Sequence, residues 1–158
     1  RLQGDWSSDV CSSDLLEVVE AAVSDRAGAA HFVSDHADGG RLAEEDSGDG
    51  GLRVSTVDLR SWLDEPVDML KMDIEGAETD LLNTCRDRLG SVANLIVEYH
   101  DPAHGPQRLD EVLAVLRHAG FRYHTFSKAH PVKPLATPYG PSGTPQYIDI
   151  FATRHTGP

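Results

Sequence analysis

Hydrophobic residues along this chain form short runs and periodic patterns that are typical of a mixed α/β domain. Residues 67–72 and 92–99 are apolar at most positions and predict buried strands, the first of them a central parallel strand covered on both faces. Apolar residues at helical spacing predict an amphipathic helix over residues 107–118, with Gly120 as its C-cap. Weaker patterns predict further strands at residues 16–23, 29–33, 52–57, 121–126 and 147–153, and short helices at 58–63 and 77–84.

The order of these elements predicts the fold class. From residue 67 onward the chain reads as strand, helix, strand, helix and a final pair of strands, which fits the second half of a doubly wound α/β sheet. Residues 34–51 are rich in glycine and acidic side chains and hold almost no large apolar residue, so they predict a mobile surface loop. Prolines between residues 131 and 145 predict a second irregular loop.

Charge and cysteine content narrow the function classes. The chain has 26 acidic against 14 basic residues, a net charge of -12, and lacks the clustered Lys and Arg that bind nucleic acid. Cys11 and Cys85 form neither a metal motif nor a disulfide framework, and no apolar run approaches the ~18 residues of a membrane span. We therefore expect a cytoplasmic protein with no nucleic-acid partner and no membrane span.

The first fifteen residues differ from the rest. The chain has no initiator Met, and Ser-Ser-Asp occurs at residues 7–9 and again at 12–14 without evident folding logic. This segment resembles translated sequencing-adapter DNA, so we expect residues 1–15 to be non-native and the natural protein to begin upstream of Leu16.

The strand predicted at residues 67–72 runs into a turn rich in carboxylates, which is where sites on open α/β sheets lie. Side chains alternate along a strand, so Asp73 and Glu75 are expected to point the same way. A carboxylate in a buried strand needs a compensating partner, which makes Asp73 the first candidate for function. Gly76 permits a positive φ or close approach of a ligand, while Glu78 suits the start of a helix and is open to a purely structural role.

The second apolar strand ends in Glu98 and His100, which alternate and so share a face. Histidine is the natural proton acceptor near neutral pH. If this strand neighbours the first one, His100 and Asp73 lie on the same rim, where a substrate hydroxyl could be activated. Glu98 is a candidate for orienting His100 or for binding substrate, and a strand-end histidine without chemistry stays open as an alternative.

The carboxylate turn has a recognisable spacing: Lys71-x-Asp73-x-Glu75-Gly76-x-Glu78, preceded by Val67-Asp68. This pattern resembles the signature of the FkbM family of S-adenosylmethionine-dependent methyltransferases. The resemblance spans roughly residues 16–153 and includes residues 17–25, 56–59, 95–100 and 119–121 in the expected order.

The resemblance implies a fold, a cofactor and several roles. The fold would be the C-terminal part of a Rossmann-like class I methyltransferase sheet over residues 16–155, with the first strands and the Gly-rich cofactor loop missing. S-adenosylmethionine would be the cofactor. Ser24 and Asp25 match the region that contacts adenine, although a plain turn explains them equally well, and Asp73, Glu75 and Gly76 would complete the cofactor-binding set.

The expected reaction is O-methylation of a sugar or other small-molecule hydroxyl, with Asp73, Glu98 and His100 as catalytic residues and no metal. The acceptor would be a small molecule or a glycan, and the chain alone is expected to be inactive. A different reading takes Asp73, Glu75, Glu98 and His100 as the divalent-metal cluster of a hydrolase or phosphoryl-transfer enzyme.

Overall fold

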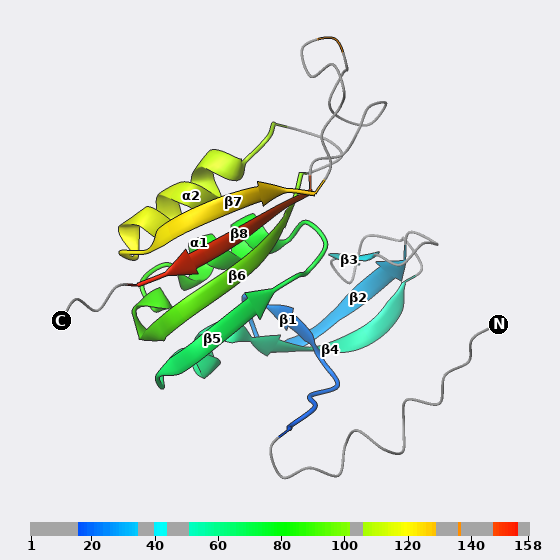
Figure 1. The fold of residues 1–158 in the computed structure, drawn as a ribbon. Helices are drawn as coiled ribbons and strands as arrows, with labels where there is room; N and C mark the ends of the chain where they lie inside the picture. The colour runs from blue at the N-terminus through cyan, green and yellow to red at the C-terminus, as the bar shows by residue number, and fades with distance from the viewer. Residues whose placement is uncertain are drawn as a thin grey trace.

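The structure, a computed structural model, describes residues 16–34, 40–43, 51–101, 106–128, 136 and 147–154. The predicted α/β class is confirmed, with the strands divided between two four-stranded sheets (Figure 1). The expectations for residues 1–15 and for the proline-rich loop lie outside the described residues, except that residue 136 is a turn. No helix in the described part of the chain is both long and apolar enough to cross a membrane.

The first sheet contains the strands that precede residue 59. Across the sheet they are β1 (Ala22–Ser24), β4 (Leu52–Asp58), β2 (Gly28–Ser34) and β3 (Gly40–Ala43). β1 runs parallel to β4, whereas β2 is antiparallel to both of its neighbours. A 3-10 helix, η1 (Leu59–Trp62), follows β4.

Two predictions for this region are wrong. The strand predicted over residues 16–23 is reduced to β1, because residues 16–21 have no pairing partner among the described residues. β3 lies inside the segment predicted as a loop; Leu42 pairs with Phe32 of β2 there. A strand of four residues is too short to show a periodic pattern in the sequence. β3 is a strand because it pairs with β2.

In the second half of the chain, the strands and helices follow one another in the predicted order. Across the second sheet the strands are β5 (Val67–Met72), β6 (Val92–His100), β8 (Tyr147–Thr153) and β7 (Arg122–Ser127). β5 and β6 are parallel, while β8 is antiparallel to β6 and β7. The helices are α1 (Glu78–Cys85), the short 3-10 helix η2 (Leu89–Ser91) and α2 (Leu109–His118).

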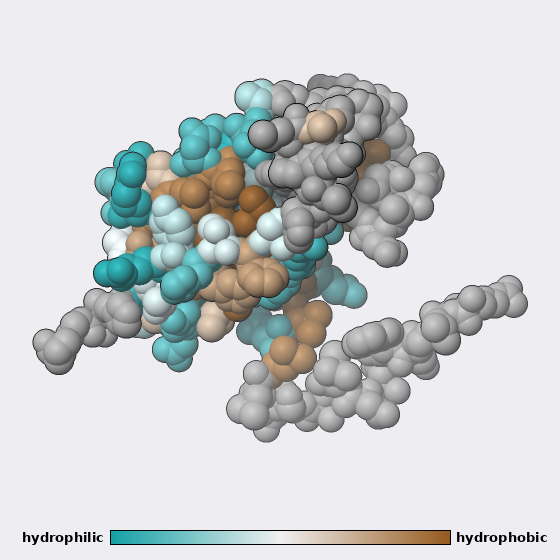
Figure 2. Space-filling model, turned by 45° about the horizontal axis from the view of Figure 1, so that its top comes forward, coloured by the Kyte–Doolittle hydropathy of each residue, from teal (hydrophilic) through white to brown (hydrophobic). Residues whose placement is uncertain are grey.

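The main core lies between this sheet and its two α-helices. Leu95, Val97 and Tyr99 alternate along β6 and are all buried, and they belong to the same cluster as Leu82 of α1 and Leu116 of α2. The side chains on the other face of β6 are only partly buried, because the described residues place no helix over that face of the sheet; they are Asn94, Ile96, Glu98 and His100. Figure 2 shows apolar side chains grouped among hydrophilic ones on the surface.

The prediction that the strand at 67–72 is covered on both faces is wrong. β5 is an edge strand of the described sheet, and Met69 is 54% exposed. Asp73 follows the end of β5 and is also exposed, so burial in a strand does not account for it. The case for Asp73 rests instead on the groups that surround it.

Candidate active site

The turn between β5 and α1 has an unusual backbone. Glu75 has a φ of 53°, the sole positive φ of a non-glycine residue in the part of the chain that the structure describes, and Gly76 follows with a φ of 99°. The carboxylate of Glu78 accepts hydrogen bonds from the backbone N–H groups of Ile74 (3.1 Å) and Gly76 (3.0 Å). The side chain of Glu78 therefore holds in place a turn that Glu75 alone would not favour.

Glu78 also holds the histidine at the end of β6. Oε1 of Glu78 lies 2.9 Å from Nδ1 of His100, and Glu78 is fully buried. The rings of Tyr147 and His100 form a T-shaped pair, with centroids 5.4 Å apart and planes at 82°. Glu78 thus has a role beyond the favourable position of an acidic residue at a helix start, and it is the group that orients His100.

The protonation states of this pair follow from their surroundings. Burial alone raises the pKa of Glu78, but the hydrogen bonds from His100 and from the Gly76 N–H outweigh it, so its pKa lies below the usual value. The hydrogen bond to Glu78 raises the pKa of His100 against the opposing effect of burial. An ionised Glu78 only accepts hydrogen bonds, so Nδ1 of His100 carries a proton and Nε2 points away from Glu78.

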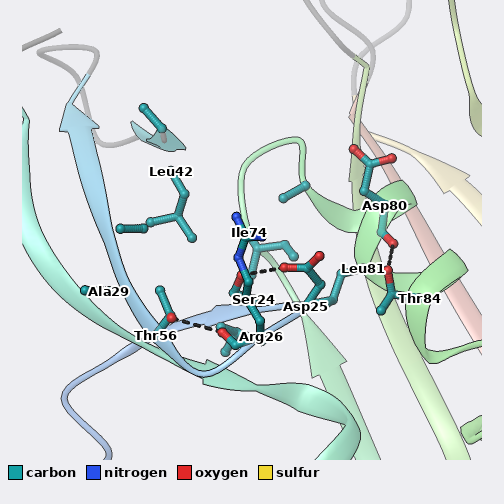
Figure 3. A pocket seen from close by; sticks show the side chains of 14 residues that line it. Ser24, Asp25, Arg26, Ala29, Leu42, Thr56, Ile74, Asp80, Leu81 and Thr84 are labelled. Atoms are coloured by element: carbon teal, nitrogen blue, oxygen red, sulfur yellow. Dashed lines mark hydrogen bonds between the residues drawn. The ribbon is translucent and has the colours of Figure 1, made fainter. Parts of the chain in front are cut away.

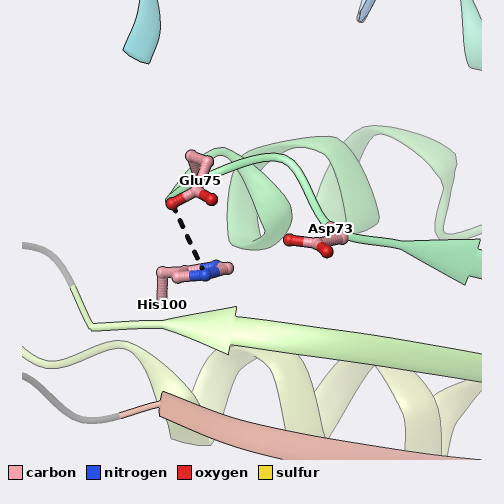
Figure 4. Close-up of side chains that lie close together, drawn as sticks. All are labelled: Asp73, Glu75 and His100. Atoms are coloured by element: carbon pink, nitrogen blue, oxygen red, sulfur yellow. Dashed lines mark ion pairs between the residues drawn. The ribbon is translucent and has the colours of Figure 1, made fainter. Parts of the chain in front are cut away.

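The imidazole of His100 lies beside the carboxylates of Glu75 and Asp73, and Nε2 is its atom closest to Glu75 (Figure 4). It lies 3.5 Å from Oε2 of Glu75, and one donor atom from each of Asp73, Glu75 and His100 lies within 4.8 Å of the others. The prediction that Asp73 and His100 share a rim is confirmed. It follows from the parallel pairing of β5 with β6, which brings the ends of both strands to the same edge.

Glu98 does not contact His100. Its carboxylate lies between two lysines, with Lys71 Nζ at 3.1 Å and Lys128 Nζ at 2.5 Å. Lys71 also pairs with Asp73 at 2.9 Å. The hydrogen bonds from Lys128 and Lys71 lower the pKa of Glu98. Of the two roles considered for Glu98, orienting His100 is therefore wrong, and its place beside Lys71 links it indirectly to Asp73.

A cavity of about 730 Å³ lies between the first sheet and α1 (Figure 3). Ser24 and Asp25 line one side, and Ile74 and Ala77, which flank the turn, line the other. The remaining lining residues are Val23, Arg26, Ala29, Ala30, Leu42, Ala43, Thr56, Asp80, Leu81 and Thr84.

The residues predicted to bind cofactor are thereby divided. Ser24 and Asp25 line the cavity, whereas Asp73, Glu75 and Gly76 do not. Along the chain, Asp73 directly precedes the cavity residue Ile74, and Glu75 and Gly76 separate Ile74 from the cavity residue Ala77. The structure therefore shows two neighbouring features on one turn: a cavity, and a rim of two carboxylates and an imidazole.

The cavity side of β1 is fixed by polar contacts. The guanidinium of Arg60 donates to the backbone carbonyl of Asp25 at 2.7 Å and to Oδ2 of Asp58 at 2.8 Å. Thr56 Oγ1 donates to the carbonyl of Arg26 at 3.0 Å. These bonds hold the backbone and leave the Asp25 side chain with a single described partner, the Ser24 hydroxyl at 3.1 Å.

The comparison with protein families decides the identity of the domain. The family described as "Methyltransferase FkbM domain" matches residues 10–123, well over half of the 158 residues. The chain belongs to the FkbM methyltransferase family. The FkbM match contains both the cavity and the carboxylate rim, and it favours methyl transfer over the metal-dependent hydrolase reading. Comparison with curated proteins and with solved structures finds no match.

The sequence alone does not reveal two contributors to this candidate site of the FkbM domain. The sequence predicts the helix that contains Glu78, but not the hydrogen bonds of Glu78 to the preceding turn and to His100. The available signal was its position directly after a glycine turn, where a carboxylate can accept backbone N–H groups. Lys128 had no signal, because only the pairing of β7 with β8 brings it to Glu98.

Proposed function

We propose that this protein transfers a methyl group from S-adenosylmethionine to a hydroxyl oxygen of a sugar or another small molecule. The observation that carries the proposal is the FkbM domain match over residues 10–123. The structure contributes a cavity for a small molecule and, on the same turn, a rim of groups that can handle a hydroxyl proton.

The cavity has suitable properties for the cofactor. Its volume of about 730 Å³ is within the ~300–1,000 Å³ typical of small-molecule sites. Ile74 and Leu81 offer apolar surface for an adenine ring, and the Ser24 hydroxyl and the Asp25 carboxylate offer hydrogen bonds. Glu75 and Gly76 would contribute from the turn beside it.

When bound, S-adenosylmethionine supplies an electrophilic methyl group: its sulfur–carbon bond breaks, a carbon–oxygen bond to the acceptor forms, and the electron pair stays on sulfur. The chain must then place the acceptor oxygen and remove its proton. Neutral His100 has its lone pair on Nε2, held toward the rim by Glu78, and this nitrogen accepts the hydroxyl proton. Asp73 orients the acceptor, and Glu98 fixes Lys71 beside Asp73.

Binding of the cofactor is tested by calorimetric titration of S-adenosylmethionine into the protein at its full natural length. We expect saturable binding with one site, weakened at least tenfold by Asp25→Ala and unchanged by Asp68→Ala, a carboxylate on β5 outside the cavity. Absence of saturable heat, or equal effects of the two substitutions, would contradict the proposal.

The reaction is tested with methyl-labelled cofactor and a panel of sugar and small-molecule acceptors. Because His100 acts on the acceptor, His100→Gln should lower kcat by about 10²-fold or more while leaving cofactor affinity nearly constant. Label on amines instead of hydroxyls would exclude O-methylation. Unchanged turnover in His100→Gln would remove this residue from the reaction.

A further inference from the structure

We propose that Asp73, Glu75 and His100 bind a divalent transition-metal ion. From the sequence we expect no metal, with a four-residue cluster that includes Glu98 as the alternative; the fold brings together three of those four side chains, without Glu98, and all three are of types that ligate such ions. They come from the end of β5, from the turn after it and from the end of β6. The inference concerns an ion bound at the acceptor rim, not the cofactor cavity.

The distances suit a single ion. Metal bonds of ~2.0–2.2 Å to nitrogen and oxygen place neighbouring donors roughly 3 Å apart. Nε2 of His100 and Oε2 of Glu75 are 3.5 Å apart, and Asp73, Glu75 and His100 each offer one donor atom within 4.8 Å of the others. Asp73 and Glu75 are exposed, so a small rotation of each carboxylate closes the remaining gap.

His100 has the hydrogen bond on its second ring nitrogen that metal-binding histidines usually have. A ligating imidazole almost always donates its other N–H to a carboxylate or carbonyl, which fixes both the tautomer and the ring orientation. In this protein Nδ1 of His100 lies 2.9 Å from Oε1 of Glu78, whose side chain is only 1% exposed. Glu78 is outside the group of three ligands and is itself anchored by the N–H groups of Ile74 and Gly76.

Charge also favours a cation at this position. Asp73 and Glu75 place two carboxylates beside one imidazole, and a cation between them would offset the repulsion between the two negative charges. Lys71 pairs with Asp73 through one oxygen only, Oδ2, which leaves the other oxygen of that carboxylate for an ion.

The ligand set indicates the class of ion. Two carboxylates with one imidazole suit Mn²⁺, Fe²⁺ or Zn²⁺ better than Mg²⁺ or Ca²⁺, which prefer sets made of oxygen alone. Three protein ligands leave at least one coordination position for water or substrate. The His100–Glu75 pair is partly accessible, with 14% and 47% of the side chains exposed, so a second molecule can reach the ion.

The ion would deepen the proposed function, and its use in catalysis rests on that function. Asp73, Glu75 and His100 would hold the ion, which would lower the pKa of an acceptor hydroxyl bound at its open position, so that this hydroxyl would release its proton to solvent. His100 would then serve as a ligand in the metal-bound protein and not as the proton acceptor. Binding of the ion does not depend on methyl transfer and can be measured separately.

The test uses Mn²⁺ as probe, titrated into chelator-treated protein at its full natural length and followed by electron paramagnetic resonance. We expect one saturable site, with Zn²⁺ displacing Mn²⁺. Asp73→Asn and Glu75→Gln should each weaken Mn²⁺ binding at least tenfold. Each substitution replaces an exposed carboxylate with an amide of nearly the same shape. Glu78→Gln should weaken Mn²⁺ binding by about 10–100-fold through the orientation of His100.

Asp68→Asn is the matched control, because Asp68 is an exposed carboxylate of β5 outside the group. The affinity of the Asp68→Asn variant for Mn²⁺ should equal that of the unmodified protein. No saturable Mn²⁺ binding, or equal loss in Asp68→Asn and Glu75→Gln, would overturn the proposed site. Saturable binding with no methyl transfer would contradict the proposed function alone, and full transfer in excess chelator would contradict the catalytic use of the ion.

Discussion

At the residue scale, Glu78 does the most to build the site. Its carboxylate accepts hydrogen bonds from two backbone N–H groups of the turn and pairs with Nδ1 of His100, and the whole residue is buried. It thereby fixes the turn that contains Glu75 and the direction of the imidazole with a single side chain. A buried carboxylate is tolerated when all of its hydrogen-bond donors are in place. Removing the carboxylate leaves those buried N–H donors without an acceptor, which costs free energy.

Replacement of Glu78 should therefore be costly to the fold. Glu78→Ala leaves two N–H groups and the imidazole N–H without an acceptor, and we expect a loss of about 3–5 kcal/mol in the free energy of unfolding. The measurement is urea denaturation followed by circular dichroism. Glu65→Ala, an exposed residue before β5, should change stability by less than about 0.5 kcal/mol. A loss below about 1 kcal/mol for Glu78→Ala would show that water replaces the carboxylate.

Cys85 offers a second prediction at this scale. It lies in the core at the end of α1, and burial raises the pKa of its thiol to about 11. The reactive thiolate is therefore scarce at pH 8, and the folded protein should alkylate at Cys85 at least 10²-fold more slowly than the unfolded protein. Mass mapping of iodoacetamide-treated peptides distinguishes this residue from Cys11. Equal rates in the folded and urea-unfolded protein would contradict the buried position.

At the element scale, the elements that the sequence predicts best are those with the clearest pattern of apolar and polar residues. β5, β6 and α2 lie within one or two residues of their predicted ranges, because long apolar runs and helical periodicity are local properties. β3 and the short β1 depend on pairing partners that no local pattern reveals. The exposure of β5 was missed for the same reason, since a strand's neighbours, not its own residues, decide how many of its faces are covered.

The packing of α1 on the second sheet predicts how much a substitution in this helix lowers the free energy of unfolding. Leu82 is fully buried in the cluster that joins α1, α2 and β6, so Leu82→Ala should reduce the free energy of unfolding by about 2–5 kcal/mol. Leu52 is 72% exposed at the start of β4, and Leu52→Ala is the matched control with an expected change below about 1 kcal/mol. Thermal or urea unfolding of both variants makes the comparison. Similar losses would mean that α1 is not anchored as the structure shows.

At the scale of the whole molecule, the candidate site is a meeting of segments that are distant in sequence. The convergence of Asp73 with His100 was predictable, because parallel neighbouring strands end at the same edge of a sheet. The chain does not predict which carboxylate holds His100, nor that Lys128 reaches Glu98 from the end of β7. Those contacts depend on side-chain geometry after the sheet has formed. The cavity was likewise hidden, since it requires the first sheet and α1 to face each other.

The same scale explains the surface of the second sheet. Met69 of β5 and Phe151 of β8 are 54% and 46% exposed and lie on the sheet face opposite the core that contains Leu95. Exposed apolar side chains on this face, together with an edge of β5 that has no partner strand among the described residues, favour self-association.

Met69→Lys should therefore reduce aggregation of the 158-residue chain, because a charge at an open sheet edge disfavours pairing with another copy. We expect light scattering at a fixed protein concentration to fall severalfold relative to the unmodified chain, with an unchanged circular dichroism spectrum. Leu52→Lys is the control: Leu52 is more exposed than Met69 but lies in the first sheet, so a similar fall there would point to net charge as the cause. Unchanged scattering in Met69→Lys would mean that the edge of β5 is not the surface through which copies of the chain associate.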